Sequence, residues 1–113
     1  MDTSKTVAAI DQAFLEEIVR RILTVATPDR IILFGSSARG GMSPDSDIDL
    51  LVVEDDPGDR QREYVRIRQA LRGLGRPFDI ILISTEWFEE SKDVVGGIAY
   101  PAHKYGKVIY EAA

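Results

Sequence analysis

Three short apolar runs rich in β-branched residues, separated by segments with helical periodicity, constrain the fold of this chain most strongly. The runs cover residues 31–34, 47–53 and 78–83, and each has the length and composition of a buried strand. Over 10–23 and 59–73, apolar residues recur every three or four positions, the spacing of a helix with one buried face. Strands that alternate with helices predict an α/β (α+β) domain.

The size of the chain fits a single domain over residues 1–113. Its 113 residues, 44% of them hydrophobic, are enough for one core and too few for two domains. A further helix is expected from residue 85, followed by a short helix over 99–105 and an edge strand or docked tail over 107–110. The sequence contains no internal repeat and no low-complexity tract.

Charge and composition exclude several classes of function. A net charge of −5 leaves no broad positive field for long nucleic acid. Cysteine is absent, and His103 is the only histidine, so thiolate chemistry, a histidine metal cluster and a Ser-His-Asp triad have little support. The first 21 residues carry acids among the apolar residues, unlike a signal peptide, and no apolar run could span a bilayer. We therefore expect a cytoplasmic protein without a membrane partner.

Three aspartates stand in or beside the apolar strands. Asp47 and Asp49 are two positions apart, so they project to the same side of a strand, and Asp79 stands in the third run. Unpaired carboxylates at such positions are costly, and three of them repel one another. Mg²⁺ relieves that repulsion and also binds phosphate oxygens. Two such ions could hold an α-phosphate between an attacking hydroxyl and a pyrophosphate leaving group.

A glycine-serine turn follows the first apolar run. Gly35 at the end of a strand lets the backbone approach phosphate oxygens, and Ser36 can donate a hydrogen bond to them. Ser37 belongs to the same expected phosphate-binding loop. Arg39 has two interpretations of similar weight, a phosphate contact or a structural ion pair with one of the acids. The lysine-containing pattern of a Walker A loop is absent.

These residues resemble the signature of the nucleotidyltransferase superfamily related to DNA polymerase β, in which Gly-Ser is followed by ten residues and Asp-x-Asp. Here the signature runs from Gly35-Ser36 to Asp47-x-Asp49. The phrases Gly-Ser-x-Ala-Arg-Gly and Ser-Asp-x-Asp-Leu, both present, are most similar to the minimal nucleotidyltransferases. The motif core of the resemblance covers about residues 31–84, and the spaced motif is far more specific than a lone Asp-x-Asp.

The resemblance implies a nucleotidyltransferase fold, which is a small mixed β-sheet flanked by helices. It implies that Asp47 and Asp49 ligate Mg²⁺, in a site for two ions, and that Asp79 completes one metal site and helps deprotonate the acceptor. Minimal nucleotidyltransferases are commonly antitoxins paired with a HEPN-domain ribonuclease toxin. The resemblance therefore implies that this chain transfers AMP from ATP to a hydroxyl, a tyrosine of such a toxin, within a hetero-oligomer.

Other interpretations remain open at this point. The chain could neutralise a toxin by binding alone, or it could modify a small molecule such as an antibiotic. Asp79 taken alone would more often be a capping or salt-bridged acid. A basic run over residues 60–76 is usually a solvated face, but it could meet an acidic partner or RNA. Its basic residues are Arg60, Arg62, Arg66, Arg68, Arg72 and Arg76.

Overall fold

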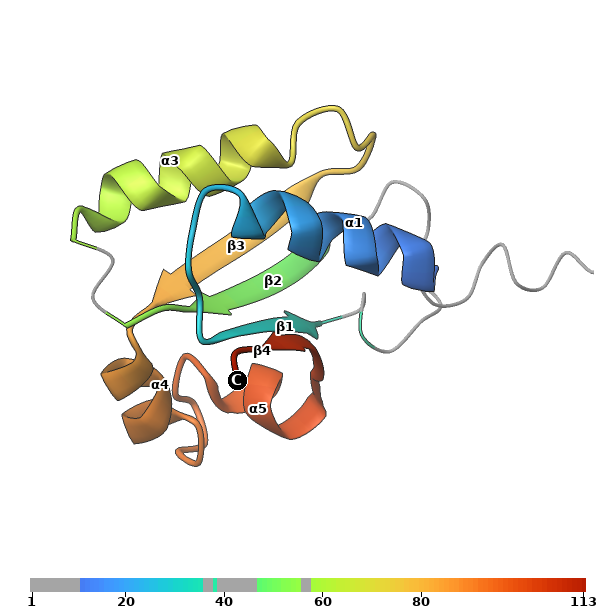
Figure 1. Cartoon of the computed structure of the whole chain (residues 1–113). Helices are drawn as coiled ribbons and strands as arrows, with labels where there is room; N and C mark the ends of the chain where they lie inside the picture. Colours follow the sequence, from blue (N-terminus) through green and yellow to red (C-terminus); the bar gives the residue numbers. More distant parts are fainter. Residues whose placement is uncertain (1–10, 36–37, 39–46, 56–57) are drawn as a thin grey trace, which may run out of the picture.

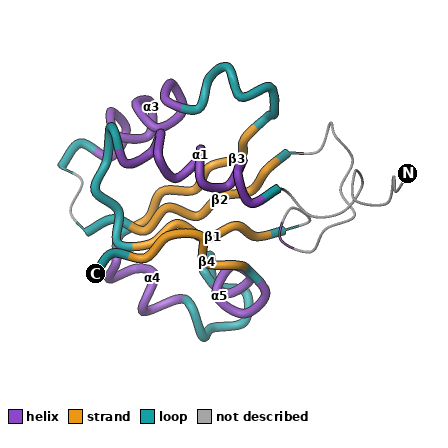
Figure 2. Tube along the Cα trace, turned by 45° about the vertical axis from the view of Figure 1, so that its right-hand side comes forward, coloured by secondary structure: helices purple, strands orange, loops and turns teal. Residues whose placement is uncertain are grey.

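The computed structural model describes residues 11–35, 38, 47–55 and 58–113. Its strands are β1 (Arg30–Phe34), β2 (Ile48–Val53), β3 (Phe78–Ile83) and β4 (Lys107–Glu111). They form one sheet in the order β3-β2-β1-β4 (Figures 1 and 2). β2 pairs in parallel with β3 and antiparallel with β1, and β4 pairs antiparallel with β1. The expected mixed sheet is thus confirmed, and the segment after residue 106 is an edge strand.

Helices cover both faces of this sheet (Figure 1). They are α1 (Gln12–Leu23), α3 (Arg60–Ala70), α4 (Thr85–Ser91) and α5 (Tyr100–Tyr105). α1 and α3 pack on one face, and α4 and α5 pack on the other. Within the described residues, none of the helices is long and apolar enough to cross a membrane.

Side-chain caps explain where three of these helices begin. A Ser or Asp side chain at the N-cap accepts a hydrogen bond from a backbone N–H of the first turn, which would otherwise lack a partner. The capping residues are Asp11 for α1, Asp59 for α3 and Ser84 for α4.

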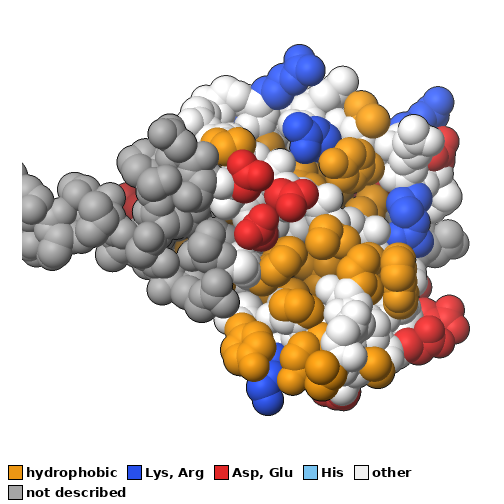
Figure 3. All heavy atoms as spheres, turned by 180° about the vertical axis from the view of Figure 1, so that it is seen from behind, with side chains coloured by type: hydrophobic (Ala, Val, Ile, Leu, Met, Phe, Trp, Pro, Cys, Tyr) orange, Lys and Arg blue, Asp and Glu red, His pale blue; other side chains and the backbone are white. Residues whose placement is uncertain are grey.

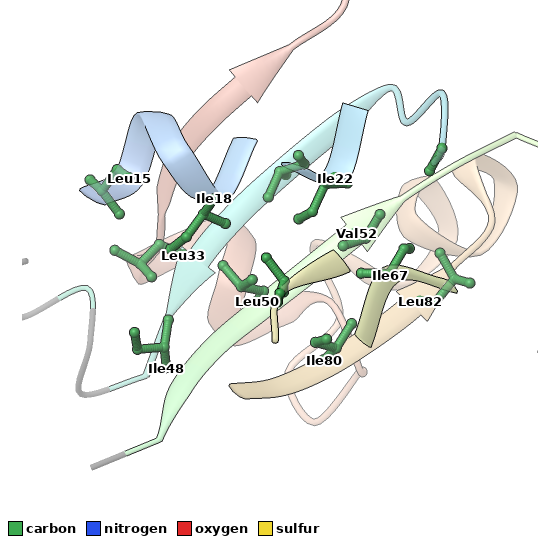
Figure 4. Packing of buried hydrophobic residues seen from close by; sticks show 13 residues of the cluster. Leu15, Ile18, Ile22, Leu33, Ile48, Leu50, Val52, Ile67, Ile80 and Leu82 are labelled. Atoms are coloured by element: carbon green, nitrogen blue, oxygen red, sulfur yellow. The ribbon is translucent and has the colours of Figure 1, made fainter. Parts of the chain in front are cut away.

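The alternation of side chains along the strands divides the core into two clusters. The larger cluster fills the space between the sheet and the α1–α3 layer (Figure 4). Its labelled members include Leu15, Ile18, Ile22, Leu33, Leu50, Val52, Ile67, Ile80 and Leu82. The smaller cluster lies on the opposite face and consists of Ile32, Leu51, Val53, Ile83, Phe88, Ala99 and Ala102. Residues next to each other on one strand therefore face different layers.

α3 ends earlier than its apolar spacing indicates. Leu71 and Leu74 continue the helical spacing, but the helix stops at Ala70 instead of extending to residue 73. Gly73 and Gly75 have φ angles of +87° and +78°. These values suit glycine and cannot continue a right-handed helix, so the turn towards β3 begins there.

Candidate active site

The parallel pairing of β2 with β3 brings two of the predicted acids together. Asp49 and Asp79 are direct partners in the register of these strands. Their chain neighbours Leu50 and Ile80 belong to the core on the α1–α3 face, so both aspartates project to the other face. Asp47 immediately precedes β2 and is exposed. Seen from behind in Figure 3, acidic side chains gather beside the residues drawn in grey.

The charge of Asp49 is unfavourable in this environment. Partial burial raises the pKa of its carboxyl group above the ordinary value of 3.8, and the negative charges of Asp79 and Asp47 raise it further. Burial acts because the charged form loses hydration, and the neighbouring carboxylates act by repulsion. A cation bound between these groups would relieve both costs.

Gly35 borders the same carboxylate. Phe34, the last residue of β1, pairs with Asp49 in the antiparallel register, and Gly35 follows it with φ +67°. A Cβ atom at this position would collide with Oδ2 of Asp49 and would lie 3.1 Å from its Cγ. The N–H of Ala38 donates to the carbonyl oxygen of Gly35 at 3.2 Å. The absence of a side chain keeps this approach open.

Three predicted phosphate-binding residues lie outside the described part of the chain. They are Ser36, Ser37 and Arg39. The described residues of the site are thus Gly35, Asp47, Asp49 and Asp79, and their roles stay predictions.

These acids fit the chemistry of Mg²⁺. Within the described part of the chain, no three His, Cys, Asp or Glu side chains form a ready-made metal cage. Mg²⁺ does not require one, since it is usually held by one or two carboxylates while waters and substrate phosphates fill its other positions.

An apolar surface adjoins the acids and was missed by sequence reasoning. Phe34 and Ile81 are partly buried on the same sheet face, Phe34 opposite Asp49 and Ile81 two positions after Asp79. Two exposed apolar residues follow β3 in the chain, Trp87 at 45% and Val95 at 80% exposed. Figure 3 shows hydrophobic side chains spread beside the acidic ones. The period-two spacing from Asp79 could have identified Ile81 in advance, whereas the position of Phe34 depends on the pairing of β1 with β2.

Two other features noted in the sequence lie apart from the acids. His103 on α5 packs edge-on against Phe88, with ring centroids 6.0 Å apart, and its Nε2 lies 3.6 Å from Oδ1 of Asp93. The basic helix α3 packs on the sheet face that Asp49 and Asp79 point away from.

Comparisons with known proteins agree with this geometry. A sequence profile described as "Nucleotidyltransferase domain" matches residues 14–101, a span that includes Gly35 and all three aspartates. The fold is similar to that of a Sulfolobus solfataricus protein assigned as a nucleotidyltransferase, with a TM-score of 0.59 and 19% identity over 88% of this chain and 79% of that chain. It is also similar to a toxin-antitoxin MntA-HpeT mutant, with a TM-score of 0.56 and 17% identity over 91% of this chain and 75% of that chain. A search of curated proteins found no match.

Proposed function

Since the chain belongs to the nucleotidyltransferase domain family, we propose that it transfers AMP from ATP to a hydroxyl group of a partner protein. The observation that carries this proposal is the pairing of Asp49 with Asp79 across β2 and β3, with Gly35 against Asp49. Carboxylates and an unobstructed glycine turn are the parts that a magnesium-bound triphosphate requires.

In the proposed reaction each part has one task. Asp47 and Asp49 would hold Mg²⁺, which would supply charge neutralisation at the transferred phosphate. The turn at Gly35 receives the triphosphate. The acceptor oxygen attacks the α-phosphorus, the bond from that phosphorus to the β-phosphate oxygen breaks, and pyrophosphate leaves with the electron pair. Asp79 accepts the proton of the attacking hydroxyl. Positioning and charge neutralisation account for most catalysis of this kind.

A protein acceptor is supported by two observations. The fold is similar to that of a toxin-antitoxin pair member, and hydrophobic side chains lie beside the acidic ones on one face of the molecule (Figure 3). Apolar patches of this kind mark protein contact sites. We assign the acceptor to a tyrosine of a HEPN-domain toxin, on the basis of the motifs that resemble minimal nucleotidyltransferases.

The same apolar surface favours a second candidate function. A chain that covers a toxin with this surface could neutralise it without chemistry. The raised pKa of Asp49 favours the enzymatic function, because a surface used only for docking has no need of clustered acids that repel one another.

Intact-mass measurement of a HEPN-domain partner, after incubation with ATP and Mg²⁺, distinguishes nucleotidyl transfer from neutralisation by binding alone. Wild type should add one AMP-sized increment, and the Asp47→Asn, Asp49→Asn double variant should add none. Asp93→Asn is the matched control, because Asp93 is an exposed acid on the α4–α5 segment, and it should behave as wild type. If the partner stays unmodified but is inhibited by wild type and double variant alike, the binding function replaces transfer.

A further inference from the structure

The outward face of α3 is strongly basic in an acidic protein. Six of the 14 basic residues of the chain fall within 60–76, and all six are arginine. The one acid in this range, Glu63, is buried. The segment therefore presents positive charge to solvent although the whole chain has a net charge of −5. The exposed members on α3 and its end are Arg60, Arg62, Arg66, Arg68 and Arg72.

Some of these arginines are used within the fold. Arg60 donates to the carbonyl oxygen of Leu82 at 3.0 Å, and Arg66 pairs with Glu63 at 2.9 Å. Arg68 donates to the carbonyl of Phe78 at 3.3 Å and lies over the ring of Tyr64. In the described part of the structure, Arg62 and Arg72 have no such partner. Their charge is available to another molecule.

Two of these arginines line an open hollow that also contains an apolar residue. The hollow has a volume of about 580 Å³ and is lined by Asp59, Gln61, Arg62, Val65, Arg66 and Gln69. Val65 is 44% exposed, although the neighbouring Ile67 is fully buried in the core. An apolar residue ringed by arginine and glutamine is typical of a protein interface, where arginine is enriched and lysine is depleted.

We propose that this face of α3 is a docking surface for an acidic segment of another protein. Guanidinium groups bind carboxylates through two parallel hydrogen bonds. Arg62 in the hollow and Arg72, two residues beyond the end of α3, supply them here. An apolar side chain of the partner, placed between its acids, fills the hollow at Val65. Long RNA fits less well, because Asp59 lines the hollow and the rest of the chain repels a phosphate backbone.

A second copy of this chain is also a poorer fit. Its acidic helix α4 carries Glu86, Glu89 and Glu90 beside Trp87, but α4 and α3 lie on opposite faces of the sheet. Contact between α3 of one copy and α4 of the next would be head to tail, and such contacts build rings or open chains of copies. A different protein with an acidic segment can bind α3 without forming such an assembly. The surface faces away from Asp49 and Asp79, so the inference does not rest on nucleotidyl transfer.

Fluorescence anisotropy with a short labelled peptide tests this docking surface. The peptide carries glutamates on both sides of a central leucine, and it should bind wild type more weakly as salt increases. Arg62→Gln with Arg72→Gln should weaken binding about tenfold. The matched control, Arg20→Gln with Lys107→Gln, removes the same charge from exposed positions on α1 and β4 and should change binding less than about twofold.

The apolar contact in the hollow is tested by combining a change in the peptide with a change at Val65. Replacing the peptide leucine by serine should weaken binding to wild type and should have little further effect on Val65→Ser, since both changes remove one contact. Three results would overturn the proposal. They are no peptide binding to wild type at low salt, equal weakening in both double variants, and a short oligouridylate that binds more tightly than the peptide and depends on Arg62 and Arg72.

Discussion

At the scale of single residues, Asp49 is the group whose protonation most affects the site. Its folded-state pKa is raised above 3.8, first by burial and then by Asp79 and Asp47. A raised pKa means that the folded protein binds this proton more tightly than the unfolded chain does. The contribution of Asp49 to stability is therefore full below pH 3.8 and is lost as the pH rises through the folded-state pKa.

Asp49→Asn should consequently stabilise the metal-free protein at neutral pH. The gain in the free energy of unfolding should be below about 1 kcal/mol, because solvent screens the exposed part of the carboxylate. Mg²⁺ should raise the melting temperature of wild type and leave that of the variant unchanged. Thermal unfolding with and without Mg²⁺ measures the stability of the variant and the effect of the ion on each protein. An equal Mg²⁺ response in the two proteins would show that the ion binds elsewhere.

Gly35→Ala tests the close approach of the turn to Asp49. The added Cβ would meet Oδ2 of Asp49 at a φ of +67°, so both the turn and the carboxylate must move. Transfer activity should fall by at least about a hundredfold. Gly75→Ala is the matched control, since Gly75 has φ +78° and nothing within 4 Å of an added Cβ. The control should lose about 1 kcal/mol of stability and keep its activity, and comparable activity in both variants would refute the argument.

The identity of the site residues, more than their contacts, was predictable from the sequence. Gly35, Asp47 and Asp49 stand out through their spacing, and Asp79 stands out as an acid in an apolar strand. That Asp49 lies opposite Asp79 depends on the parallel register of β2 and β3, which no local pattern specifies. Phe34 was predicted only as part of a strand, because its place beside the acid follows from the pairing of β1 with β2.

At the scale of elements, a buried carboxyl pair connects β2 with α3. Glu54 follows β2, Glu63 lies on α3, and each is only 4% exposed. The backbone N–H and the hydroxyl of Thr27 donate to Oε2 of Glu54, both at 3.3 Å. Burial raises the pKa of Glu54 above 4.5, and its hydrogen bond with Glu63 raises it further. Protonation of Glu54 is therefore favoured in the folded protein.

Glu54→Gln should remove the pH dependence that Glu54 gives to the stability of the fold. Because the folded-state pKa of Glu54 is raised, its contribution to stability is present below pH 4.5 and is lost as the pH rises through the raised value. The variant keeps an acceptor for Thr27 and a donor for Glu63 without a charge, so it should gain about 1 kcal/mol over wild type at mildly alkaline pH. Urea denaturation at acidic and alkaline pH measures the difference. A variant that is less stable than wild type at both pH values would contradict this explanation.

The elements themselves were largely predictable, whereas their order in the sheet was not. Periodicity located β1, β2 and β3 within one residue of each end, because short β-branched runs are buried on both sides. The last segment stayed ambiguous between an edge strand and a tail, since its pairing with β1 depends on residues about 80 positions away in the chain. The early end of α3 depends on Gly73 and Gly75, whose positive φ overrides the spacing of Leu71 and Leu74.

At the scale of the whole molecule, α3 contributes one face to the hydrophobic core and the other to the exposed surface. Ile67 on α3 is fully buried in the larger cluster, and Val65 on the same helix is 44% exposed. Ile67→Ala should cost about 2–5 kcal/mol in the free energy of unfolding, because it leaves a cavity between the sheet and the α1–α3 layer. Val65→Ala should change it by less than about 0.5 kcal/mol. Chemical denaturation measures the free energy of unfolding of both variants. Similar losses in the two would mean that Val65 is part of the core.

The proposed activity requires the acids to hold a metal-bound nucleotide. Calorimetric titration with a non-hydrolysable ATP analogue tests this without any partner. Wild type should bind the analogue only when Mg²⁺ is present, and Asp47→Asn, Asp49→Asn and Asp79→Asn should each weaken binding about tenfold or more, while Asp93→Asn should bind as wild type. No binding to wild type in Mg²⁺, or unchanged binding to the three variants, would contradict the assignment of the site.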